Sequence, residues 1–145
     1  MESLENCRWR VYLVKNIGCF GEYATLSELL RNDIEAYPAI SKNQEDYDIT
    51  VVVNNLKVVR LQVKTTELQN KSTNNSIKGT DKQYDFLVLV VVDNEHAKFY
   101  VIPKSKVDEI RGNHVDLSVS QKNGNAYCLK DCFNDFEDKW DSIKS

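Results

Sequence analysis

The stretch that decides the fold is YDITVVVNNLKVVRLQVKTT, which runs from Tyr47 to Thr66. Its first half, Tyr47 to Val53, is rich in β-branched residues and ends at Asn54-Asn55, a pair typical of turns. Its second half, Lys57 to Lys64, alternates apolar and polar residues, as a strand with one buried face does. The sequence therefore predicts two strands joined as a tight β-hairpin.

The polar side chains of this hairpin gather on one of its faces. Side chains alternate between the two faces of a strand, so Gln62 and Lys64 lie on one face and Val63 on the other. Antiparallel pairing of the two strands can place Asp48 on the same side as Gln62 and Lys64. A carboxylate, an amide oxygen and an ammonium group would then converge on one side of the sheet.

Upstream of the hairpin, Gly18 to Asn32 carries apolar side chains at helical spacing. Glu22 falls on the apolar stripe of this helix, where a carboxylate is costly unless it is paired or bound to a metal. If the stripe packs on the sheet, Glu22 points to Asp48, and two carboxylates with an amide oxygen suit Mg²⁺. The alternative for Glu22 is an acid in the first helical turn, favoured by the helix dipole. Glu28 is expected to face away from Glu22 and to be exposed.

The rest of the chain predicts further strands and helices. Phe86 to Asp93 is almost continuously apolar, which predicts a central strand buried on both faces. The polar stretch Thr65 to Gln83 is expected to be a long loop. This order predicts an α/β (α+β) fold with a mixed central β-sheet flanked by helices. The remaining predicted elements are strands at Ala97 to Ile102 and Ala126 to Leu129, a helix at Ser105 to Arg111 with Ser105 as its N-cap, and a helix at Phe133 to Ile143.

Length and charge limit the class of protein. A chain of 145 residues with 41% hydrophobic and 28% charged residues is predicted to form a single domain, 1–145. The net charge of −3 excludes a generally basic nucleic-acid-binding surface but allows a local basic patch. Acidic residues gather in 131–145, which is expected to be an acidic C-terminal helix or tail. No apolar run approaches the roughly 20 residues that a membrane span needs.

The four cysteines, Cys7, Cys19, Cys128 and Cys132, are expected to be free, partly buried thiols. No secretory signal is visible in Met1 to Arg10, and a chain of this size needs no disulfide in order to fold. Both observations favour a reducing, cytoplasmic location. No histidines or cysteines are found at convincing zinc-ligand spacing, and no organic cofactor is expected.

Three short segments resemble the PD-(D/E)XK nuclease superfamily: GEY at Gly21 to Tyr23, YDI at Tyr47 to Ile49 and QVKTT at Gln62 to Thr66. In that family a helix carries a Glu, one hairpin strand carries the Asp, and the next strand carries (D/E)-x-K. The order and spacing match over Ile17 to Ile102, which implies a restriction-endonuclease-like core. The chain looks most like the small Q-x-K branch, which includes group I intron-associated homing endonucleases. Archaeal-type Holliday junction resolvases are similar in size and layout.

The chain departs from the common family pattern at two positions. Gln62 stands where most members carry Glu or Asp, and Tyr47 stands where the family has a proline. The neutral side chain of Gln62 is expected to weaken metal affinity. Its carbonyl oxygen still provides a ligand, so coordination is not abolished.

The resemblance implies metal-dependent hydrolysis of a DNA phosphodiester, with Mg²⁺ as the metal and Mn²⁺ as a substitute. Asp48 would be the central ligand, and Glu22 would hold a second metal or a metal-bound water. Gln62 and the Val63 carbonyl would complete the coordination. Lys64 would orient or help to deprotonate the attacking water and offset charge in the transition state. A chain with one active site would cut both strands only as a homodimer or a higher homo-oligomer.

A locally basic segment is the best candidate for DNA contact, because phosphate binding needs clustered cations and polar donors. Its alternative is an ordinary solvated loop, and the two interpretations stay open. Tyr84 and Trp9 are expected to be core or interface aromatics rather than base-stacking platforms. The predicted contacts are Lys57, Arg60, Lys71, Asn74, Asn75, Lys78, Lys82 and, in a second patch, Lys104.

Three functions remain open at this point. Homing or restriction-like DNA cleavage is favoured, and junction resolution is the alternative within the nuclease class. The second class is a non-catalytic module with a nuclease fold that binds nucleic acid or protein, which Gln62 keeps open. The third is an interaction domain without any nucleic-acid role, which the acidic 131–145 segment would suit.

Overall fold

The computed structural model describes residues 16–39, 46–54, 56–70 and 75–145. The predicted hairpin is present: β2 (Ile49–Val53) pairs antiparallel with β3 (Lys57–Glu67), and Ile49 lies opposite Leu61. The second strand is longer than predicted. Residues Thr65 to Glu67, expected to begin a loop, continue β3 because they pair in parallel with a later strand.

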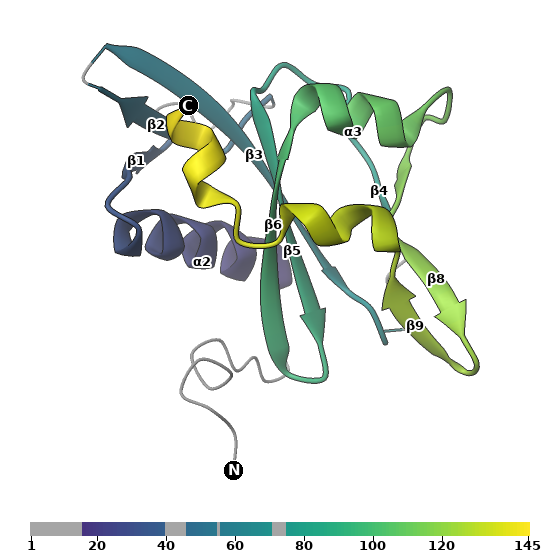
Figure 1. The fold of residues 1–145 in the computed structure, drawn as a ribbon. Coiled ribbons are helices and arrows are strands. Elements are labelled where there is room, and N and C mark those ends of the chain that lie inside the picture. The colour runs from purple at the N-terminus through teal and green to yellow at the C-terminus, as the bar shows by residue number, and fades with distance from the viewer. Residues whose placement is uncertain (1–15, 40–45, 55, 71–74) are drawn as a thin grey trace.

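The hairpin lies inside a five-stranded mixed sheet with the order β1-β2-β3-β5-β6 (Figure 1). β1 (Glu35–Pro38) was not predicted and forms one edge, antiparallel to β2. β5 (Phe86–Asp93) is parallel to β3, and β6 (His96–Pro103) is antiparallel to β5. The residues Leu87–Val90 are fully buried, which confirms a central strand covered on both faces.

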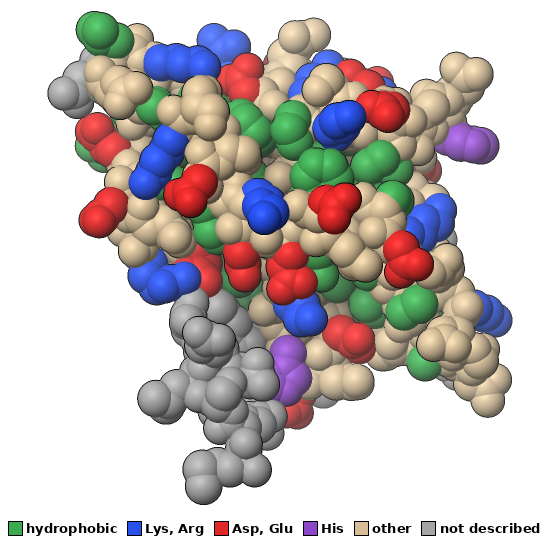
Figure 2. Space-filling view, in the orientation of Figure 1, with side chains coloured by type: hydrophobic (Ala, Val, Ile, Leu, Met, Phe, Trp, Pro, Cys, Tyr) green, Lys and Arg blue, Asp and Glu red, His purple; other side chains and the backbone are tan. Residues whose placement is uncertain are grey.

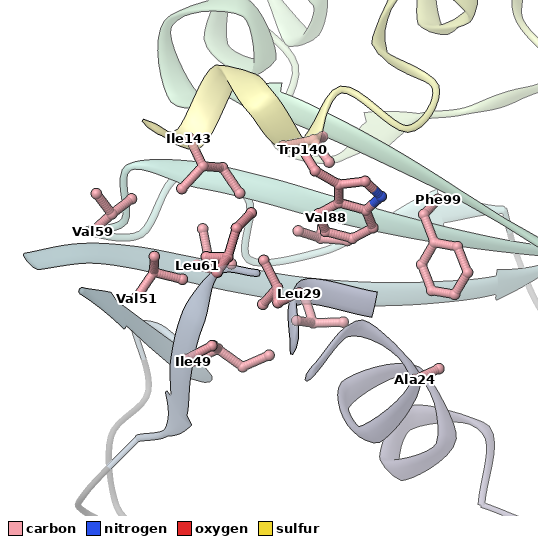
Figure 3. Close-up of a cluster of buried hydrophobic side chains, with 14 of the residues drawn as sticks. Ala24, Leu29, Ile49, Val51, Val59, Leu61, Val88, Phe99, Trp140 and Ile143 are labelled. Carbon is pink, nitrogen blue, oxygen red and sulfur yellow. The ribbon is translucent and has the colours of Figure 1, made fainter. Parts of the chain in front are cut away.

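Helices cover both faces of this sheet. α2 (Ile17–Arg31) packs against β1, β3 and β5, whereas α3 (Lys104–Arg111) packs against β5, β6 and a short strand, β7. Each face has its own apolar cluster, and Figure 3 shows the cluster on the α2 face. The remaining described elements are β4 (Ser76–Ile77), β7 (Leu117–Ser118), β8 (Ser120–Asn123), β9 (Ala126–Leu129) and the 3₁₀ helices η1 (Asp131–Phe136) and η2 (Trp140–Lys144). The mixed sheet flanked by helices is the predicted fold class.

Two predicted helix features were wrong. α3 begins at Lys104 after Pro103, and Ser105 is not its N-cap. The single helix predicted at Phe133 to Ile143 is divided into η1 and η2. Asp138, between them, has a φ of 53° and its backbone N–H donates to the Phe99 carbonyl at 2.9 Å. Pairing with the edge of β6 therefore interrupts the helical run.

Within the described residues, no helix is long and apolar enough to cross a membrane. Cys19, Cys128 and Cys132 are free thiols as expected, but only Cys128 is partly buried and the other two are exposed. Cys7 and Trp9 lie outside the described residues.

Candidate active site

Asp48 lies immediately before β2 and is held by the neighbouring strand. Its backbone N–H donates to the Leu61 carbonyl at 2.8 Å, although Ile49 is the residue that lies opposite Leu61, so the regular register ends at Ile49. Its Oδ2 accepts hydrogen bonds from Gln62 Nε2 at 3.0 Å and from the Val63 backbone N–H at 2.8 Å. The hairpin therefore brings Asp48 and Gln62 together as the alternation predicted.

Glu22 reaches this carboxylate from α2, although not along the predicted route. The buried face of α2 includes Glu28 and Leu29, and Glu22 is exposed at its side. Partial burial, and then the charge of Asp48 and a hydrogen bond with it, raises the pKa of Glu22, against the effect of Lys64. The first turn of α2 contains no acid, which removes the helix-dipole alternative.

Glu28, predicted to be exposed, is buried with 3% of its surface accessible. Its Oε2 accepts a hydrogen bond from Arg31 Nε at 2.6 Å, one turn along the helix. The two acids of α2 are thus the reverse of the prediction: Glu22 is the exposed one and Glu28 the buried one. The expected apolar stripe included Glu22, whereas the buried face of α2 consists of Gly21, Ala24, Thr25, Glu28 and Leu29.

Gly21 is a contact that the sequence analysis missed. It is buried, and a Cβ built on it would overlap Thr65 Oγ1 of β3. Thr65 Oγ1 is itself buried and has no hydrogen-bond partner among the described residues. The absence of a side chain at Gly21 therefore lets the helix backbone approach β3 one residue before Glu22. The sequence signal was present in GEY, but its partner in β3 is far away in the chain.

The oxygen atoms at this site fit a hard cation. Gln62 is 5% exposed, and its Oε1 is buried without a hydrogen-bond partner among the described residues. An orphaned buried acceptor is unfavourable, and here it lies beside Asp48, which in turn contacts Glu22. No group of three or more His, Cys, Asp or Glu that could hold a metal occurs in the described part of the chain. A cation here would therefore depend on amide and main-chain oxygens in addition to the two carboxylates.

Lys64 completes the cluster on the same face of β3 as Gln62. Its side chain is half-buried, and burial lowers the pKa of its ammonium group. Asp48 and Glu22 act in the opposite direction, and Lys82 adds to the lowering. The arrangement thus combines two acids, an unpartnered amide oxygen and a partly desolvated cation.

The predicted DNA-contact residues occupy different environments. Lys57, Arg60 and Lys78 are exposed, and the guanidinium of Arg60 lies 5.7 Å from the centre of the Tyr47 ring. Lys82 and Lys104 are half-buried, and Lys104 Nζ lies 5.8 Å from the centre of the Tyr84 ring. In Figure 2, acidic and basic side chains are interspersed on the face shown, among the residues coloured there. Lys71 and Asn74 lie outside the described residues.

Asn75 has a structural environment within the same predicted set. Its Oδ1 accepts from Thr66 Oγ1 at 2.6 Å and its Nδ2 donates to the Leu68 carbonyl at 3.0 Å. Both ends of the amide are therefore engaged with β3 and the residue that follows it. DNA contact by Asn75 stays a prediction, as it does for the other members of the set. Tyr84 is buried, which confirms its expected place in the core.

Comparison with known proteins finds a related fold and no matching sequence family. No family model matches the chain, and no curated protein matches it. Among solved structures, the bacterial homing endonuclease I-Ssp6803I is similar with a TM-score of 0.61 and 19% sequence identity. The match covers 92% of this chain and 94% of that one. The chain therefore has the nuclease-like fold of a mixed sheet flanked by helices.

Proposed function

We propose that this chain is a metal-dependent DNA endonuclease of the PD-(D/E)XK type, in its Q-x-K variant, with homing or restriction-like cleavage as its activity. The observation that carries the proposal is the unpartnered Oε1 of Gln62 beside the Asp48 and Glu22 carboxylates, on a fold shared with a homing endonuclease. A cation would supply that oxygen with a partner and offset the repulsion between the acids.

In this proposal the site holds Mg²⁺, or Mn²⁺ in its place. Asp48 is the central ligand because the Val63 N–H and Gln62 fix its orientation. Glu22, Gln62 Oε1 and the Val63 carbonyl are the other candidate ligands. The bound cation supplies Lewis-acid stabilisation of charge that develops on the phosphate oxygens.

Lys64 acts on the water and the phosphate rather than on the metal. Its half-buried ammonium group interacts electrostatically with both Asp48 and Glu22. An ammonium group there orients the attacking water and offsets the negative charge that accumulates in the transition state. Because burial lowers its pKa, Lys64 also gives up a proton more readily than an exposed lysine, which suits a role in deprotonating that water.

The proposed partner is DNA, bound by a chain that acts as a homodimer or a higher homo-oligomer. Each chain offers one set of acids, so two copies are needed to cut both strands at one place. The exposed cations Lys57, Arg60 and Lys78 supply phosphate contacts outside the centre.

Cleavage of three DNA forms tests the proposal. The purified protein is incubated with Mg²⁺ or Mn²⁺ and with linear, supercoiled or four-way-junction DNA, beside Asp48→Ala. We expect wild type to cut, and Asp48→Ala and an EDTA-treated sample to be inactive. Asp141→Ala, which removes an exposed acid of η2, is the control and should retain activity.

The DNA forms separate the competing functions. Preferred cutting of the four-way junction favours a Holliday junction resolvase. DNA binding without cleavage in either metal favours a non-catalytic module with a nuclease fold. Absence of both cleavage and salt-sensitive DNA binding contradicts any nucleic-acid role.

A further inference from the structure

We propose that Lys82 acts beside Lys64 as a second cation for the scissile phosphate, presented by the loop from Gly79 to Tyr84. This inference rests on the proposed nuclease function. It assigns to Lys82 a place in the reaction centre, in contact with the non-bridging oxygens of the phosphodiester that is cut, instead of a place on the outer DNA-binding rim.

The positions of the two lysines carry the inference. A Cβ built on Gly79 would lie 3.5 Å from Lys64 Nζ and 3.4 Å from Lys82 Cε. The two side chains therefore approach the same small space, from β3 and from the loop that precedes β5. Gly79 has a φ of 73° and no side chain, so it leaves that space open.

The loop that carries Lys82 is anchored on both sides. Thr80 is fully buried, its carbonyl accepts from the Tyr84 hydroxyl, and its Oγ1 accepts from Arg111 Nη1 at 3.1 Å. The backbone N–H of Gln83 donates to Asp46 Oδ1 at 3.4 Å, two residues before Asp48. Lys82 therefore projects from a loop whose position is set by α3 and by the segment that leads to the acids.

Charge explains why two cations can be held there. The two ammonium groups lie close enough for the charge of Lys82 to help lower the pKa of Lys64. Asp48 and Glu22 act on Lys64 in the opposite direction, and a phosphodiester between the lysines would contact both cations at once. Cations fixed in place before the substrate arrives stabilise developing charge without reorganisation.

Lys78 provides the matched comparison within the same segment. It lies one residue before Gly79, and its side chain is exposed, whereas Lys82 is half-buried. An exposed lysine contributes to DNA affinity through counterion release and has little effect on the chemical step. The two lysines should therefore affect different kinetic constants.

The test is single-turnover cleavage of linear DNA in Mg²⁺ by Lys82→Met, Lys82→Arg and Lys78→Met. At saturating protein, we expect Lys82→Met to slow cleavage by about 10- to 100-fold, and Lys82→Arg to recover much of the rate. Lys78→Met should lower mainly the affinity. Lys139→Met, which removes an exposed cation far along the chain from the site, is the control and should leave the saturating rate unchanged. Binding of the same DNA in EDTA over a salt series gives a second readout, in which Lys82→Met lowers the salt slope by about one.

Four results decide the matter. A slower chemical step in Lys82→Met alone, with a circular dichroism melting curve like that of wild type, supports the inference. Equal saturating rates for Lys82→Met and Lys78→Met overturn it while the proposed function stands. If Lys82→Met fails to fold, Lys82→Gln replaces it in the same assay. A saturating rate for Lys82→Gln equal to that of wild type overturns the inference. A wild-type protein that cuts no DNA overturns both proposals together.

Discussion

The two acids of α2 form a natural comparison, because they lie six residues apart on one helix and have opposite environments. Glu28 is buried at 3% exposure and bonded to Arg31 at 2.6 Å. Glu22 is exposed, and its carboxyl group meets another carboxylate, that of Asp48. Glu28 is ion-paired with Arg31 on its own helix, whereas at Glu22 the charge of Asp48, from a different element, outweighs that of Lys64.

This difference separates an acid that serves the fold from an acid that serves a site. A charge-assisted hydrogen bond from a neighbouring cation offsets the desolvation cost of a buried carboxylate. At Glu22 the repulsion from Asp48 exceeds the attraction to Lys64, and a bound cation would reduce this imbalance. Burial alone would have suggested Glu28 as the functional acid of α2. The neighbouring Asp48 carboxylate shows that Glu22 is the better candidate for the site.

The largest expected effect comes from neutralising the exposed acid. Glu22→Gln removes one of the two carboxylates and is expected to lower the rate of DNA cleavage by about 10- to 100-fold. The melting temperature should stay level or rise, because the repulsion with Asp48 is relieved. Cleavage assays and thermal melts of the same preparation measure both. If Glu22→Gln lost stability but kept full cleavage activity, Glu22 would serve the fold and not the site.

A smaller but broader effect is expected at Gly21, which sets the distance of Glu22 from the sheet. Gly21→Ala places a methyl group onto Thr65 Oγ1 and is expected to lower stability by about 1–3 kcal/mol and to reduce cleavage. Chemical denaturation and cleavage rates measure the two effects.

Gly18→Ala is the control for that helix. A Cβ at Gly18 meets no atom within 4 Å, so this variant is expected to gain about 0.5–1 kcal/mol from helix propensity. In Gly21→Ala combined with Thr65→Ala, the overlap is relieved and part of the stability should return. If Gly18→Ala and Gly21→Ala changed the free energy of unfolding equally, the close approach of Gly21 to Thr65 would have no effect on stability.

The buried acid should respond in the opposite sense to Glu22. Glu28→Gln weakens the charge-assisted bond with Arg31 and is expected to lower stability by about 1–2 kcal/mol. The folded fraction should retain its cleavage rate, because Glu28 takes no part in the proposed site. Urea denaturation measures the change in stability, and the cleavage rate per folded molecule measures the activity. A loss of rate without loss of stability would place Glu28 in the site.

The smallest expected effect is a pH dependence of stability that arises at Asp138, which lies near Glu28. Partial burial, and then Glu137 and Glu28, raises the pKa of Asp138 above its ordinary value of 3.8, against the effect of Arg31. A raised pKa means that the folded state holds the proton more tightly. The stabilising contribution is therefore complete below pH 3.8 and is lost as the pH rises through the raised value.

Asp138→Asn should remove that loss. Asparagine tolerates the positive φ of 53° at this position, so the backbone is expected to be unaffected. The melting temperature of the variant relative to wild type should increase between about pH 3 and about pH 7. Asp141→Asn, which alters an exposed acid, should show a flat difference. A flat difference for Asp138→Asn as well would contradict the assignment.

Local patterns predicted the part of the site that is local in the chain. Alternation and a turn pair were sufficient for the β2–β3 hairpin, and with it for the pairing of Asp48 with Gln62. The apolar run at Phe86–Asp93 likewise revealed a strand buried on both faces. These features depend on neighbours a few residues away, which a single sequence displays.

Features that depend on distant partners were not predictable in the same way. α2 buries the face that carries Gly21 and Glu28, with Gly21 against Thr65 of β3, so the burial of Glu22 and Glu28 was predicted the wrong way round. The break between η1 and η2 depends on pairing of Asp138 with Phe99. Helical periodicity carries no information about either contact.

The parallel pairing of β3 with β5 also has a consequence for the order of folding. The hairpin closes a short turn, so Asp48, Gln62 and Val63 come together through contacts that form early. The link from the Arg60 N–H to Asp85 Oδ2 joins residues 25 positions apart, and parallel pairing must wait for that longer loop to close. By this order of loop closure we expect Asp48 and Gln62 to pair before the lysine-bearing loop docks, and Glu22, which lies 26 positions from Asp48, to join them no earlier than that loop.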